Sequence, residues 1–188
     1  MRIIIEGLDR VGKSLLITNI IKSIGYHHVV HYGKPIQSSI YNNSLEEYQK
    51  QSFIKGFELL INNTDIIFDR FILGECVYAH RYRDYDGDYV FEYEENFNIQ
   101  NYNDVFLILL TCSDTSIMVD DGESHDFSMK NAEQEDFISA YNKSIIMHKM
   151  MLNIYDPKTC YYKSEEAILE HVLSFLKISH AITDFRVL

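Results

Sequence analysis

Near the start of the chain, two glycines, a lysine and a serine stand at a spacing that points to one kind of chemistry. Gly7 is followed, after four residues, by Gly12, Lys13 and Ser14, which matches the pattern G-x-x-x-x-G-K-[ST]. Glycines let successive backbone N–H groups curl around phosphate oxygens, the lysine charge reaches the terminal phosphates, and the serine hydroxyl can bind Mg²⁺. An ordinary glycine turn is the alternative, but the complete match favours a nucleotide-phosphate site in residues 7–14.

An acid and a base follow one another after the apolar run of residues 65–69, DIIFD, whose last residue is Asp69 and which leads into Arg70. In a parallel α/β sheet, ligands bind at the carboxyl ends of the strands, so both side chains would lie beside the glycine loop. Asp69 can hold Mg²⁺ through water, and Arg70 can clamp phosphate oxygens with two N–H donors. The simpler alternative is an exposed acid and base that end a strand.

The rest of the chain predicts the elements that would position these residues. Apolar and β-branched runs predict strands at residues 2–5, 27–35, 65–69, 104–111 and 159–162. Apolar spacing and caps predict helices at residues 15–24, 45–62, 73–83, 132–153 and 164–177. The alternation of strand and helix indicates an α/β fold, a doubly wound parallel five-stranded sheet flanked by helices. Residues 84–104 are acidic and aromatic and leave the type of element open.

Composition narrows the function further. A chain of 188 residues suits one well-buried domain, and its net charge of −11 argues against a broad surface for nucleic acid or anionic membrane. The cysteines Cys76, Cys112 and Cys160 have no C-x-x-C spacing and are read as reduced thiols. No apolar run is long enough for a membrane span. We therefore expect a soluble cytoplasmic protein, in the host cytoplasm if the source is viral.

The segments IIIEGLDRVGKS and DIIFDRF, with Tyr78 a few residues on, resemble the thymidylate kinase family of nucleotide kinases. The signature of that family is an E-G-x-D-x-x-G-K-S loop, then D-R-[YF], then a tyrosine one or two turns later. The likeness extends more loosely over most of the chain. It implies one P-loop kinase domain over residues 1–188, of the P-loop NTPase or nucleotide-kinase type, with a lid-like segment at about 113–131. ATP, Mg²⁺, a small nucleotide substrate and a homodimer are also implied.

The resemblance assigns donor-side roles to residues of the glycine loop. The ATP phosphates would be held by Gly7, Val11, Gly12, Lys13, Ser14 and Leu15, and Mg²⁺ by Ser14 and Asp69. One subgroup of the family carries the arginine that stabilises the transition state inside the loop rather than in the lid. Since residues 113–131 contain no arginine, Arg10 would take that role here.

The acceptor side is less fully matched. The resemblance places Asp9 at the sugar 3′-hydroxyl, Arg70 at the acceptor phosphate, and Phe71 and Tyr78 against the base or sugar. Phe53 and Phe57 would stack a base, yet residues 45–62 lack the arginine that normally reads thymine. Arg81 and Arg83 are additions to the pattern that would bind a more charged acceptor or be neutralised by nearby acids, namely Asp84, Asp86 and Asp88.

These residues predict ATP-dependent phosphoryl transfer to a deoxynucleoside monophosphate, with a dTMP-like acceptor favoured. A deoxynucleoside kinase is an alternative, for which Glu6, Asp69 and Glu75 are candidate bases, and so is a kinase of modified thymine in DNA. A nucleotide-binding protein that transfers nothing belongs to another class. Two further clusters are given structural roles. The histidines His27, His28 and His31 are expected at a strand end, and the methionine-rich residues 147–155 are expected to pack the predicted helix at residues 132–153 into the core.

Overall fold

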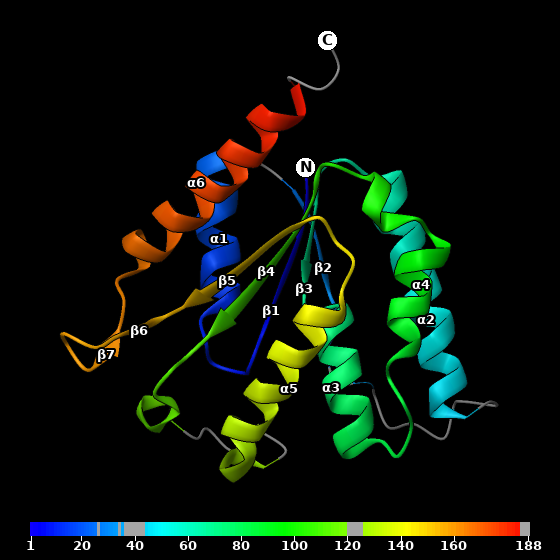
Figure 1. The fold of residues 1–188 in the computed structure, drawn as a ribbon, viewed down its shortest axis with the longest axis horizontal. Coiled ribbons are helices and arrows are strands. Elements are labelled where there is room, and N and C mark those ends of the chain that lie inside the picture. Colours follow the sequence, from blue (N-terminus) through cyan, green and yellow to red (C-terminus); the bar gives the residue numbers. More distant parts are fainter. Residues whose placement is uncertain (26, 34, 36–43, 120–125, 185–188) are drawn as a thin grey trace.

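The computed structural model describes residues 1–25, 27–33, 35, 44–119 and 126–184, with side chains to residue 177. Its centre is a parallel five-stranded sheet in the order β2-β3-β1-β4-β5 (Figure 1). The strands are β1 Arg2–Gly7, β2 His28–His31, β3 Ile66–Asp69, β4 Val105–Thr111 and β5 His148–Asn153. The predicted fold class is confirmed.

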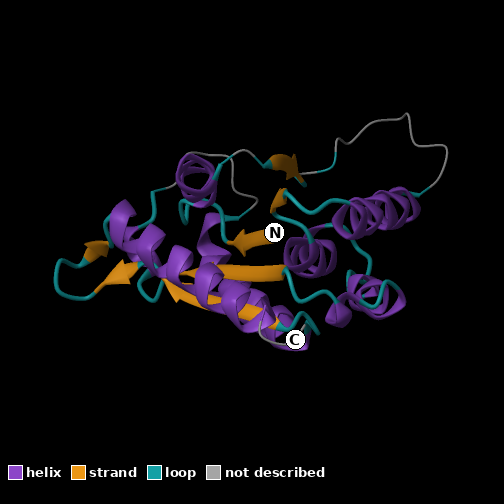
Figure 2. Ribbon diagram, turned by 90° about the horizontal axis from the view of Figure 1, so that it is seen from above, coloured by secondary structure: helices purple, strands orange, loops and turns teal. Residues whose placement is uncertain are grey.

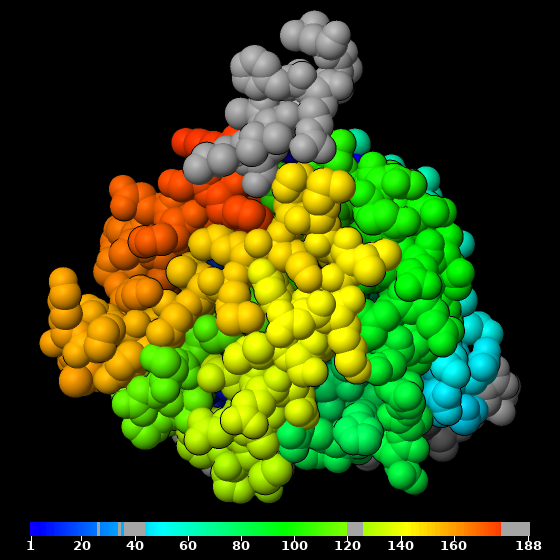
Figure 3. Space-filling model, in the orientation of Figure 1, coloured from blue at the N-terminus to red at the C-terminus, as the bar shows by residue number. Residues whose placement is uncertain are grey.

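Helices cover both faces of this sheet (Figures 1 and 2). They are α1 Lys13–Ile24, α2 Leu45–Asn62, α3 Ile72–Tyr82, α4 Tyr89–Asn96, α5 Lys130–Lys143 and α6 Glu165–Asp184. On one face α1 packs against α6, and on the other α3 packs against α4 and α5 while α2 packs against α4. In the space-filling view of one side of the molecule, the segment from α5 to β5 lies between α6 and the α3–α4 region (Figure 3). None of the helices in the described ranges has the length and hydrophobicity to span a bilayer.

The apolar pattern explains why the central strands form. All residues of β1, β3 and β4 are buried, as expected of parallel strands covered on both faces. The helix ends follow their caps. The Ser44 hydroxyl accepts the Glu47 N–H at 3.2 Å and begins α2, and Gly25 ends α1 with φ 100°. The sheet is thus specified mainly by its buried core.

The prediction of one helix over residues 132–153 is wrong. The helix ends at Lys143, since Ser144 has the extended ψ of 136° and its hydroxyl donates to Glu94 of α4 at 2.7 Å. The same carboxylate accepts the Ile145 N–H at 2.8 Å. The methionine-rich residues that follow form β5, which pairs with β4. Their core role within a helix is therefore also wrong.

The predicted fifth strand at residues 159–162 is not part of the main sheet. Tyr161–Tyr162 (β7) pairs antiparallel with Tyr155–Asp156 (β6) in a separate hairpin before α6. The ambiguous residues 84–104 contain α4 and a 3₁₀ turn at Ile99–Asn101. Two more such turns, Thr115–Ile117 and Phe127–Met129, lie in the lid-like segment, of which residues 120–125 are outside the described ranges.

Candidate active site

The glycine loop joins β1 to α1 and lies close against β4. A Cβ atom on Gly7, which has φ 135°, would come within 2.4 Å of the Leu110 carbonyl oxygen. Gly12 has φ 83° and stands directly before the first residue of α1. Both positions therefore need glycine, the first for space and conformation and the second for conformation. Val11 is buried in the loop, whereas Leu15 is 46% exposed on the first turn of α1.

Lys13 lies at the centre of the loop. Its side chain is buried, and its ammonium group donates to the carbonyl oxygens of Gly7 at 2.8 Å and Leu8 at 2.5 Å. Burial, reinforced by the positive charge of Arg70, lowers the pKa of Lys13 to about 8. The ammonium group is thus held by backbone dipoles with a second cation nearby.

Arg70 faces the loop from the residue after β3. Its backbone N–H donates to the Ile5 carbonyl oxygen at 3.0 Å, and its backbone has φ 62°. Its guanidinium forms an ion pair with Asp9. Burial opposes ionisation of Asp9, but the charges of Arg70 and Lys13 outweigh it and lower the pKa of that carboxyl. The structure therefore brings together Asp9, Lys13 and Arg70, as the sequence predicted.

Asp69 ends β3 and contacts two elements. Its Oδ2 atom lies 3.0 Å from Nδ1 of His31 and accepts the Ser14 hydroxyl at 3.4 Å. Its Oδ1 atom is buried and has no hydrogen-bond partner among the described residues. A buried carboxylate oxygen without a partner, beside a hydroxyl at the helix start, is a donor set that fits Mg²⁺ and its waters.

His31 is the residue at this site that the sequence interpretation missed. The sequence predicts a structural strand end here, and His31 does end β2; the register of the parallel pair β2 and β3 also sets it beside Asp69. Its Nε2 atom lies 3.5 Å from a terminal nitrogen of Arg70, and its side chain is 54% exposed. The available signal was that both residues end neighbouring strands, since carboxyl ends of parallel strands share one edge.

Glu6, just before the loop, fixes the start of α3. One carboxylate oxygen accepts the N–H groups of Phe71 at 2.8 Å and Leu73 at 2.9 Å. The side chain is fully buried, and burial raises its pKa to about 7. Glu6 therefore ties the phosphate loop to the segment that carries Arg70.

Three phenylalanines predicted to lie against a base are in the core instead. Phe53 and Phe57 on α2, and Phe71 before α3, are at most 2% exposed. Phe53 stacks on Phe71 with ring centroids 5.3 Å apart, and Phe57 stacks on Phe97 at 5.4 Å. A base could reach these rings only if the cluster opened, so we give them a structural role.

Tyr78 lies closer to the loop. Its ring packs edge-on against Phe137 of α5 at 5.6 Å. Burial, with the negative charges of Asp9 and Glu133, raises the pKa of its hydroxyl. Its position beside Asp9 is compatible with the predicted contact to the sugar or base.

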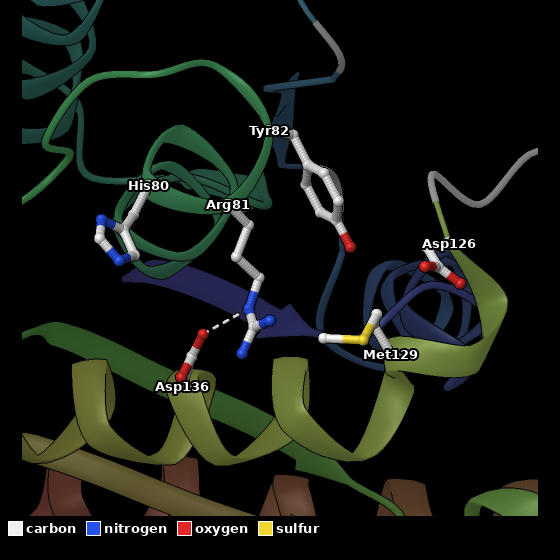
Figure 4. A pocket seen from close by; sticks show the side chains of 6 residues that line it. All are labelled: His80, Arg81, Tyr82, Asp126, Met129 and Asp136. Atoms are coloured by element: carbon white, nitrogen blue, oxygen red, sulfur yellow. Dashed lines mark hydrogen bonds and ion pairs between the residues drawn. The ribbon is translucent and has the colours of Figure 1, made fainter.

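Arg81 lines a pocket between the end of α3 and the start of α5 (Figure 4). The pocket has a volume of about 470 Å³ and is lined by His80, Arg81, Tyr82, Asp126, Met129 and Asp136. The guanidinium Nε atom donates to Asp136 at 2.5 Å. The described contact of Arg81 is thus with Asp136, and its role in substrate binding stays a prediction.

Arg83 has a buried partner that the sequence did not indicate. Its guanidinium pairs with Glu75 at 2.5 Å, and the hydroxyls of Tyr85 and Tyr89 donate to the same carboxylate at 2.8 Å each. Neutralisation of Arg83 by the acids at 84, 86 and 88 is the predicted alternative, and the structure pairs Arg83 with Glu75 instead. Glu75 is only 3% exposed, so it is enclosed rather than available as a base.

Of the comparisons with known proteins, the one with solved structures found matches. No protein-family model and no curated protein matches the sequence. Among solved structures, the YorR protein of Bacillus subtilis in complex with phosphorylated GDP has a TM-score of 0.69 at 17% identity, over 96% of this chain and 98% of that chain. Thymidylate kinase from Candida albicans has a TM-score of 0.61 at 14% identity, over 95% of this chain and 92% of that chain. Deoxyadenosine kinase from M. mycoides has a TM-score of 0.52 at 20% identity, over 93% of this chain and 100% of that chain. The chain has the P-loop nucleotide-kinase fold that these thymidylate and deoxyadenosine kinases share.

Proposed function

We propose that this protein transfers the terminal phosphoryl group of ATP to a deoxynucleoside monophosphate, with a dTMP-like acceptor favoured. The observation that carries the proposal is that the glycine loop holds one cation and binds a second, since the Lys13 ammonium donates to the carbonyl oxygens of Gly7 and Leu8 while Arg70 pairs with Asp9 of the same loop. Both cations are oriented by groups of the loop, and charge-assisted contacts from an ammonium and a guanidinium are those that phosphate oxygens accept. A site of this kind suits a reaction in which two phosphate-bearing molecules meet.

The chemistry asks mainly for positioning and charge stabilisation. On the donor side, the loop amides and Lys13 hold the phosphates, and Arg10 stabilises charge on the transferred group. On the acceptor side, Arg70 binds the acceptor phosphate and Asp9 orients both Arg70 and the sugar. Ser14 and Asp69 would hold Mg²⁺, which neutralises charge on the phosphates when bound. The segment 113–131 would serve as the lid, and residues 1–188 as one kinase domain that is soluble, cytoplasmic and homodimeric.

A deoxynucleoside kinase is the second candidate, and His31 is the observation that favours it. A hydroxyl acceptor must lose a proton, whereas an acceptor phosphate needs no strong base. In the tautomer in which Nδ1 donates its proton to Asp69, the Nε2 atom of His31 lies beside Arg70 without a proton. Nε2 would then accept the proton of the acceptor hydroxyl. Two of the carboxylates predicted as bases, Glu6 and Glu75, are at most 3% exposed. Neighbours named thymidylate kinase and deoxyadenosine kinase leave both acceptor classes in view.

The test is ATP-dependent phosphorylation of a panel of deoxynucleosides, deoxynucleoside monophosphates and DNA carrying modified thymine. Lys13→Ala removes the loop cation, and Lys22→Ala, an exposed lysine in the last turn of the same helix, is the matched control. Transfer to a monophosphate that survives His31→Gln supports the first candidate. Transfer to a nucleoside that is lost in His31→Gln supports the second. Binding of ATP without transfer to any acceptor would favour a nucleotide-binding protein that transfers nothing.

A further inference from the structure

His31 lies between the two charged residues at the end of β3. Its Nδ1 atom is 3.0 Å from Oδ2 of Asp69, and its Nε2 atom is 3.5 Å from a terminal nitrogen of Arg70. An arginine side chain has only N–H donors, so the imidazole nitrogen that faces it carries no proton. The ring proton is therefore on Nδ1, and it is donated to the carboxylate of Asp69.

The backbone around His31 is fixed to two neighbouring elements. β2 ends at His31, which is in register with Asp69, and the next N–H group, of Tyr32, donates to the Asp69 carbonyl oxygen at 3.1 Å. The Tyr32 ring packs on Phe53 of α2 with centroids 5.0 Å apart, and its hydroxyl donates to the Ser52 carbonyl oxygen at 3.0 Å. The strand end that carries His31 is thus anchored to β3 and to α2.

A glycine two residues later leaves the space that the His31 ring occupies. A Cβ atom on Gly33 would lie 2.9 Å from Nε2 of His31 and 3.1 Å from Cδ2 of the same ring. A larger residue at position 33 would therefore displace the imidazole. The orientation of the ring thus depends on a close approach of the backbone as well as on its two polar neighbours.

The group that His31 contacts is the carboxylate assigned to Mg²⁺. Oδ2 of Asp69 has contacts with both His31 and Ser14, whereas Oδ1 is buried and has no hydrogen-bond partner in the part of the chain that the structure describes. Rotation of the carboxylate would exchange the two oxygens, and a hydrogen bond from a fixed imidazole opposes that rotation. Partners of this kind orient the groups that bind a metal and raise the affinity of the site.

We propose that His31 is a positioning residue for Asp69, which holds the carboxylate in the orientation that serves Mg²⁺ while Arg70 orients the imidazole. The inference rests on the proposed function, because it takes Asp69 as the carboxylate that holds Mg²⁺ beside the nucleotide phosphates. It places His31 on the cation side of the site for either class of acceptor.

The experiment measures how much Mg²⁺ raises the affinity of the full-length protein for ADP, by calorimetric titration in Mg²⁺ and in EDTA. His31→Ala removes the donor, and His31→Asn keeps an N–H donor at the place of Nδ1. His28→Ala, at an exposed histidine of the same strand, is the matched control. The gain in affinity from Mg²⁺ should fall about three- to tenfold in His31→Ala. It should fall by less than about twofold in His31→Asn and in His28→Ala.

The decisive comparison adds Asp69→Ala and the double variant. If His31 acts through Asp69, His31→Ala should change the gain from Mg²⁺ by less than about twofold in the Asp69→Ala background. An equal loss in both backgrounds, an unchanged gain in His31→Ala, or no gain in the wild type would overturn the inference.

Two further results would also overturn the role of His31. One is a His31→Asn variant that loses as much as His31→Ala. The other is a loss of ADP affinity in EDTA as large as the loss in Mg²⁺, which would mean that the substitution disturbs the glycine loop rather than Asp69. Absence of transfer to every acceptor would contradict the proposed function alone, because no acceptor enters these titrations.

Discussion

Among single residues, Arg70 and Arg81 differ in the place of their ion pairs. Arg70 pairs with Asp9 beside Lys13, whereas Arg81 pairs with Asp136 in an open pocket. Arg70→Gln should lower kcat/KM for the acceptor about 100-fold, since it removes a charge-assisted contact. Arg81→Gln should change it by less than about threefold, as expected for a partly exposed pair. Initial rates at varied acceptor concentration give both values. A larger loss for Arg81 would contradict this account and support its predicted role in substrate binding.

Glu6 gives a prediction about pH. Its pKa is raised from 4.5 to about 7 by burial, so between these values the folded protein binds more protons than the unfolded chain. The stabilising contribution of the neutral carboxyl is therefore present below pH 4.5 and is lost as the pH rises through about 7. Glu6→Gln cannot titrate. The unfolding free energy of the wild type relative to this variant should fall by up to about 3 kcal/mol between pH 4.5 and pH 8.

Urea denaturation at the two pH values measures this difference, with the exposed Glu95→Gln as control. A wild-type minus variant difference that stays constant with pH would show that Glu6 is ionised throughout.

The placement of residues in a local motif could be predicted from the sequence, and the placement of residues that meet through tertiary pairing could not. The loop glycines, Lys13 and Asp69 follow from spacing along the chain. His31 and the Glu75–Arg83 pair depend on strand register and on side chains folding back across α3, which a linear pattern does not encode. The packing of the predicted phenylalanines was missed for a related reason, because aromatic residues on an apolar helix face pack with each other in the core.

At the scale of elements, the contact between the loop and β4 limits what the first glycine can become. Gly7→Ala would place a Cβ atom 2.4 Å from the Leu110 carbonyl oxygen of a buried strand, whereas a Cβ atom on Gly12 meets nothing within 4 Å. Both glycines have positive φ, so each substitution carries conformational strain of about 1–2 kcal/mol. Gly7→Ala should therefore destabilise the protein by clearly more than Gly12→Ala. Thermal unfolding of the two variants measures this, and equal losses would mean that β4 does not confine the loop.

The helix and strand boundaries show the same division between local and distant causes. The start of α2 follows from Ser44, directly before the helix, and Glu47 in its first turn, and the prediction of 45–62 is confirmed. The end of α5 depends on Glu94, about 50 positions earlier in the chain, which receives hydrogen bonds from Ser144 and Ile145. No pattern within residues 132–153 reveals that partner, so strand β5 was missed and the fifth strand was sought in residues 159–162.

At the scale of the molecule, strand order accounts for the site. With β1 between β3 and β4, and β2 beside β3, the carboxyl ends of three strands deliver the glycine loop, Asp69 and His31 to one edge. The chain as a whole carries a net charge of −11, yet this edge gathers Arg10, Lys13 and Arg70. The proposed anionic ligand would therefore be bound by a local arrangement of cations within a negatively charged protein.

The most direct test of the central claim is transfer of the radiolabelled terminal phosphate of ATP, with Mg²⁺, to deoxynucleoside monophosphates in a single turnover. The wild type and Lys22→Ala should both form labelled diphosphate. Lys13→Ala should form it about 100- to 1,000-fold more slowly, because the buried ammonium that stabilises the phosphates is gone. A wild type that binds ATP but labels no acceptor, or a Lys13→Ala variant as fast as Lys22→Ala, would contradict the account.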